Sequence, residues 1–135
     1  MTLIETACAA AILALAVAGL TNVSATSAAL HRAGVEKAAA MRAAERQLST
    51  ILASDFATLT ADWDGTGFAA GIEGKAGMAL RSLPGDADGM PGSVSITAPT
   101  GNSAELVDIL VRVEWVSARG PANLTRRMRL SRLGS

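Results

Sequence analysis

The stretch that decides the fold is Leu3 to Leu20, LIETACAAAILALAVAGL. Its length is about what an α-helix needs to cross the roughly 30 Å hydrocarbon core of a bilayer. Up to residue 30 the only ionisable side chain is Glu5, and the charged region begins at His31. The sequence therefore predicts a membrane-spanning helix here and a change of solvent near residue 30.

Composition excludes several classes of function. At 135 residues the chain is long enough for one modest globular domain. Its 12 Lys and Arg balance its 12 Asp and Glu, so no net field draws in nucleic acid. Cys8 and His31 are the single residues of their types, which rules out an internal disulfide and argues against a metal centre or a nucleophilic triad. We expect neither an enzyme nor a cofactor.

The polar flank of the apolar run argues against a cleaved secretory signal. Such a signal carries Lys or Arg before its apolar core and a small-residue cleavage site after it. Met1 and Thr2 supply no basic side chain. We therefore expect the segment to remain as an anchor.

Glu5 needs a physical explanation, because an isolated carboxylate costs several kcal/mol or more in hydrocarbon. The cation nearest in sequence is the amine of Met1, and pairing with the amine of a neighbouring chain would neutralise both groups and set the axial stagger. Alternatively, Glu5 lies in the first helical turn near the headgroups, where the helix dipole favours an acid. The residues alone leave both readings open.

A family resemblance bears on this choice. It rests on MTLIE at residues 1–5, AAAILA at residues 9–14, and Gly19-Leu20. This pattern resembles the mature N-terminus of type IV pilins and type II secretion pseudopilins. The resemblance implies that a prepilin peptidase removes a short leader and methylates Met1, and that Glu5 pairs with a neighbouring subunit's amine during assembly.

The resemblance also implies a location and partners. The chain would reside in the inner membrane before assembly, and afterwards in an extracellular filament or a periplasmic pseudopilus, as a homo-oligomer served by the pilus assembly machinery. The leading hypothesis is therefore a structural subunit of a type IV pilus-like extracellular filament. The alternatives are a minor pseudopilin of a type II secretion system and a monomeric membrane-anchored periplasmic binding domain. The expected filament-core packing residues are Leu3, Ile4, Ile12, Leu13, Leu15, Val17 and Leu20.

The chain departs from the family pattern at two places. Met1 stands where the family usually has Phe, so an unprocessed initiator methionine is an alternative. Filament-forming members often carry a helix-breaking proline near position 22, where this chain has Asn22. Gly and Asn are poor helix formers, so we expect a local melt or bend around Gly19 and Asn22.

Residues 26–54 continue the helix as an amphipathic segment. Helical periodicity places Leu30, Met41, Leu48 and Leu52 near one face, with charged residues mostly on others. We divide the chain into 1–25, a transmembrane or filament-core half, 26–54, an amphipathic half, and 55–135, a small β-sheet domain.

The last part is rich in turn residues and strand patterns. Strands are predicted at 76–83, 93–98, 106–117 and 123–130, the third with strict alternation. The arginines of the last strand should face water. The predicted fold class is α+β, a long N-terminal helix packed on a three- or four-stranded antiparallel sheet.

Two Asp-x-Asp-Gly segments resemble the start of calcium loops. They contain Asp62 and Asp64, and Asp86 and Asp88. Neither is followed at the required offset by a bidentate Glu. Turn chemistry, in which Asp caps backbone amides, is therefore the favoured reading, and weak calcium binding is the alternative.

Overall fold

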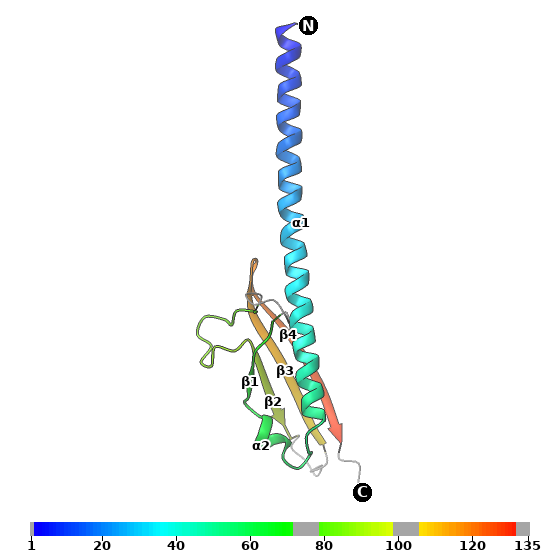
Figure 1. Ribbon diagram of the computed structural model, residues 1–135, viewed down its shortest axis with the longest axis vertical. Helices are drawn as coiled ribbons and strands as arrows, with labels where there is room; N and C mark the ends of the chain where they lie inside the picture. Colours follow the sequence, from blue (N-terminus) through cyan, green and yellow to red (C-terminus); the bar gives the residue numbers. More distant parts are fainter. Residues whose placement is uncertain (1, 72–78, 99–105, 132–135) are drawn as a thin grey trace. The chain divides into compact units, whose positions relative to one another are not determined.

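The computed structural model describes residues 2–71, 79–98 and 106–131. Its elements are α1 (Leu3–Leu52), α2 (Leu59–Trp63), β1 (Gly67–Phe68), β2 (Gly92–Thr97), β3 (Leu106–Ser117) and β4 (Gly120–Ser131). The expected α+β class is confirmed, with a long N-terminal helix and a four-stranded antiparallel sheet (Figure 1). Contacts divide the chain into two compact units, Met1–Gly34 and Val35–Ser135. The first unit contains the N-terminal part of α1, and the second contains the remainder of α1 and the sheet.

The four strands follow one another across the sheet in the order β1-β2-β3-β4. The β3–β4 hairpin is the main pairing, since every residue from Leu106 to Ser117 has a partner between Gly120 and Ser131. Its two-residue turn closes on Gly120, whose φ of 115° is costly for any residue with a Cβ.

The core of the second unit lies between one face of the sheet and α1, which crosses that face (Figure 1). Alternation in β3 places every second side chain inward, and Ile109, Val111 and Val113 are fully buried. The strand predicted at 106–117 is confirmed with these bounds. The buried residues that α1 contributes are Ala39, Ala40, Ala44, Leu48 and Ile51.

The helix face differs from the one that the sequence predicted. Leu48 is buried, but Leu30 and Leu52 are 54% and 44% exposed, so the face that these leucines share by periodicity is not buried as a whole. Ile51 and three alanines form that face instead. Alanine allows a helix to approach closely, and bulky sheet residues such as Trp115 fill the remaining volume.

The first predicted strand was also wrong. Of residues 76–83, the first three lie outside the described part, Ala79 makes a single bridge to Gly71, and residues 80–83 are irregular. This segment makes isolated hydrogen bonds, with the Leu80 N–H donating to the Ala70 carbonyl over 2.9 Å. The edge strand is instead the short β1, which pairs with β2. The ring of Phe68 occupies the space that a side chain at position 92 would need, so β2 has a glycine, Gly92, there.

The last strand is longer than predicted, and one of its arginines points the other way. Arg127 and Arg129 are exposed on the outer face of the sheet, as expected. Arg126 pairs with the inward-facing Val111 and lies on the helix side, where its Nη2 is 3.9 Å from Oε1 of Glu45. Strand alternation thus places Arg126 on the other face of the sheet from Arg127 and Arg129, although its side chain is still 43% exposed.

Candidate functional site

The carboxylate of Glu5 is bonded within its own chain. Its Oε2 accepts a 2.8 Å hydrogen bond from the backbone N–H of Thr2 and a 3.3 Å bond from the Thr2 hydroxyl. The backbone N–H of Glu5 in turn donates to the Thr2 carbonyl over 3.0 Å. This arrangement corresponds to one half of a capping box, in which a Glu three residues after the N-cap satisfies the free N–H of the cap.

The Thr-x-x-Glu spacing was a readable signal for this cap, and our sequence reasoning did not use it. The contact satisfies one backbone donor at the helix start and places an acid at the positive end of the dipole. Met1, the predicted counterpart of Glu5, lies outside the described residues. Pairing between Glu5 and a neighbouring amine therefore stays a prediction.

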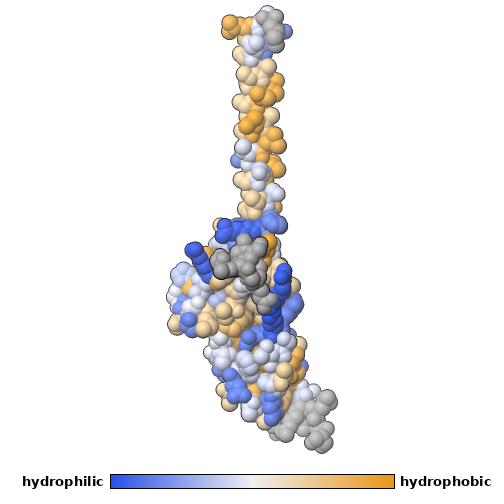
Figure 2. Space-filling view, viewed as in Figure 1, coloured by the Kyte–Doolittle hydropathy of each residue, from blue (hydrophilic) through white to orange (hydrophobic). Residues whose placement is uncertain are grey.

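The described part of the first unit exposes apolar side chains along the helix (Figure 2). None of the side chains in the apolar window of α1 is buried. By length and composition, α1 is long and apolar enough to cross a membrane, which is compatible with anchoring there. All seven predicted packing residues are exposed, from 54% to 88%: Leu3, Ile4, Ile12, Leu13, Leu15, Val17 and Leu20.

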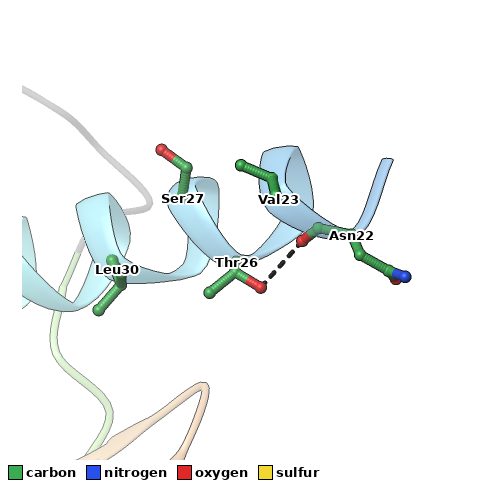
Figure 3. Close-up of a pocket in the computed structure, with 5 residues that line it drawn as sticks. All are labelled: Asn22, Val23, Thr26, Ser27 and Leu30. Atoms are coloured by element: carbon green, nitrogen blue, oxygen red, sulfur yellow. Dashed lines mark hydrogen bonds between the residues drawn. The ribbon is translucent and has the colours of Figure 1, made fainter. Parts of the chain in front are cut away.

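Past the apolar run, α1 carries a shallow hollow lined by polar and apolar side chains (Figure 3). Asn22, Val23, Thr26, Ser27 and Leu30 line it. The Thr26 hydroxyl donates to the Asn22 carbonyl over 2.9 Å. Such bonds to a preceding turn compete with the helix ladder and often bend a helix.

We expected a local melt or a bend at Gly19 and Asn22, and the structure shows no melt there. Both residues are helical, and α1 has no break between Leu3 and Leu52, so a melted segment is absent from this described helix. A bend at these residues within an assembly remains a prediction.

Two of the four aspartates in the calcium-like segments, Asp64 and Asp88, bond the backbone. Oδ1 of Asp64 accepts the N–H of Ile96 at 2.8 Å and so ties the α2–β1 turn to β2. Oδ1 of Asp88 accepts the N–H of Met90 at 2.9 Å. Asp62 lies in α2. Within the described residues no three His, Cys, Asp or Glu side chains are arranged to hold a metal.

Asp86 lies in an electrically unfavourable place. Partial desolvation raises its pKa, and the neighbouring charge of Asp88, a hydrogen bond with that residue and the charge of Glu114 act in the same direction. The structure thus gathers negative charge at the loop before β2. Charge repulsion of this kind destabilises the ionised form.

The outer face of the sheet carries an ion cluster. Asp108 of β3 accepts hydrogen bonds from Arg127 at 2.7 Å and from Nε and Nη2 of Arg129 at 2.8 and 3.1 Å. Hydrogen bonds from Arg129 and then Arg127 hold the pKa of Asp108 well below its usual range. Strand register explains the cluster, because Asp108 is directly opposite Arg129.

No protein-family model, curated protein or solved structure matches this chain.

Proposed function

We propose that the chain is a structural subunit of a type IV pilus-like filament, in which the first unit of α1 packs against the same segment of other copies. The observation that carries the proposal is the exposure of the apolar side chains from Leu3 to Leu20, together with Glu5 in the MTLIE segment. Apolar surface of this extent requires a membrane or a partner surface. A filament supplies the partner surface after the subunit leaves the membrane.

In this proposal Glu5 gains a second partner in the filament. In the single chain its carboxylate bonds Thr2, whereas in the filament it would also accept the amine of a neighbouring Met1. A carboxylate has about four lone-pair positions, so the two contacts are compatible. The attraction between the Glu5 carboxylate and the neighbouring amine would offset part of the cost of burying Glu5 between helices.

A second candidate is a monomeric anchored protein, and the capping contact itself favours it. Because Thr2 already satisfies Glu5 within the chain, the acid at the helix start needs no neighbour. The third candidate, a minor pseudopilin of a type II secretion system, shares the assembly mechanism. Imaging separates these candidates, since long filaments made mainly of this chain belong to the first alone.

The two roles of Glu5 are separable by substitution. Glu5→Gln keeps a side chain that caps the Thr2 N–H but removes the charge, while Glu5→Ala removes both. We expect both variants to enter the membrane and both to give few filaments by electron microscopy of cells. Normal filament yield with Glu5→Gln and loss only with Glu5→Ala would reduce Glu5 to a helix cap and contradict the proposed pairing.

Processing is tested on the same samples. Intact-mass measurement of the purified wild-type chain should find one added methyl group on Met1 and no residues before it. An unmethylated chain that also forms no filaments would favour the anchored monomer.

A further inference from the structure

Among the described residues, β4 is the last strand of the sheet, and its outer edge pairs with no other strand. In an antiparallel pair, residues alternate between those bonded to the partner strand and those whose N–H and C=O point away. The N–H groups of Glu114 and Val116 in β3 donate to the Pro91 and Arg81 carbonyls over 2.7 and 3.0 Å. The backbone N–H groups of Glu114 and Val116 therefore point away from β4.

This direction fixes which backbone groups of β4 lie at the free edge. Glu114 is opposite Asn123, so Asn123 also points its N–H and C=O away from the hairpin. Alternation continues the set to Thr125, Arg127 and Arg129. In the described part of the chain β4 has no strand neighbour except β3, so this row of donors and acceptors is available to an added strand.

A row of apolar side chains runs beside this edge on the helix side of the sheet. Whereas the inward-facing residues of β3 are buried, Leu124, Met128 and Leu130 of β4 are only partly buried. The helix thus leaves the margin of the apolar face partly uncovered. An added strand with apolar residues on this side would cover it.

The other side of the same edge is basic. Arg127 and Arg129 are 65% and 60% exposed and share one carboxylate, Asp108, whose side chain is 13% exposed. Two guanidinium groups against one carboxylate leave an excess positive charge on this side. Two copies of β4 would bring like charges together across the new pair, which is unfavourable.

We propose that the β4 edge, from Asn123 to Ser131, binds an extended segment of a different protein, with apolar side chains toward α1 and carboxylates beside Arg127 and Arg129. Main-chain hydrogen bonds would supply affinity, and alternate side chains would supply specificity. Pro121 ends the site, because it lacks an N–H. The binding surface belongs to the folded sheet unit and does not depend on filament assembly.

The test uses the full chain in detergent micelles and peptides of about eight residues, a usual strand length. A peptide alternating valine with glutamate should bind, and its N-methylated form should not, because methylation removes the main-chain donors. Hydrogen exchange measured by NMR should slow at the amides of Asn123, Thr125, Arg127 and Arg129. Equal binding of the N-methylated peptide, or no binding of either, would overturn the proposal.

Two variants separate edge pairing from damage to the fold. Thr125→Pro removes an edge donor, and Thr125→Ala at the same position keeps it; the first should weaken binding about tenfold, and the second should not. Arg127→Glu should move the preference from the valine–glutamate peptide to a valine–lysine peptide while Arg129 still holds Asp108. For Arg127→Glu, an unchanged peptide preference with an unchanged melting temperature would contradict the charge argument. If the wild-type chain self-associates through its sheet unit and Thr125→Pro abolishes this, the edge would bind a second copy and not a different protein.

Discussion

Asp108 shows how one carboxylate organises the outer face of the sheet. It binds two arginines of the neighbouring strand, and only 13% of its side chain is exposed. Charge-assisted, bidentate contacts of this kind are the stronger class of hydrogen bond. The arginines themselves remain mostly exposed, so screening by solvent limits what each pair contributes to stability.

We expect Asp108→Asn to lower the melting temperature at neutral pH. The folded-state pKa of Asp108 is depressed from 3.8, so its stabilising contribution is present above that value and is lost as the pH falls through the lower folded-state value. Melting curves between pH 7 and pH 2 should therefore converge for wild type and variant at the acidic end. A constant difference across this range would show that the variant acts through packing and not through charge.

Asp86→Asn should have the opposite sign. Because the folded-state pKa of Asp86 is raised, its ionised form is unfavourable in the fold. The contribution of Asp86 to the stability of the fold is therefore present below the ordinary pKa of 3.8 and is lost as the pH rises through the folded-state pKa. We expect the variant to melt higher than wild type near pH 7 and to match it near pH 3, in chelator. A large rise of the wild-type melting temperature on adding calcium would instead revive the calcium reading of Asp86 and Asp88.

At the scale of elements, α1 has two surfaces of different origin. In the second unit its buried face consists of alanines with Leu48 and Ile51, and it packs on a sheet face built from alternating residues of β2 and β3. In the first unit the apolar residues surround the helix and none is buried. A one-sided apolar stripe is typical of a helix on a folded core, and an apolar surface all round is typical of a membrane span or an assembly core.

Neighbouring residues of α1 provide a matched test of the packed face. Ile51 is fully buried and Leu52 is 44% exposed. Ile51→Ala should destabilise the second unit by about 2–5 kcal/mol, because it removes buried methyl groups and leaves a cavity. Leu52→Ala should cost below about 1 kcal/mol. Urea unfolding monitored by circular dichroism measures both, and equal losses would contradict the assigned face.

At the scale of the whole molecule, the division into two units predicts separate behaviour. The second unit, Val35–Ser135, contains the hydrophobic core and all four strands. A fragment starting at Val35 should therefore fold as a water-soluble monomer, whereas the full chain should require detergent. Size-exclusion chromatography and circular dichroism of the fragment provide the check, and an unfolded fragment would show that the first unit is needed for folding.

The sequence by itself determined the long apolar helix, the α+β class and the bounds of β3. These follow from local patterns, since an uninterrupted apolar run and a strict alternation each permit one regular structure. It also contained the Thr2–Glu5 cap as a three-residue spacing, although that signal was not used. Such features depend on residues close together in the chain.

Only the tertiary structure decided which side chains meet. It chose Ile51 and alanines over Leu52 for the helix face, because close approach to the sheet favours small residues there. It placed Arg126 on the helix side of the sheet by strand register, and it put the short β1 beside β2, with no strand at residues 80–83. Pairing between residues far apart in the sequence sets these outcomes. A shift of one residue in strand register, or a step of one residue along the helix, moves a side chain from the core to solvent.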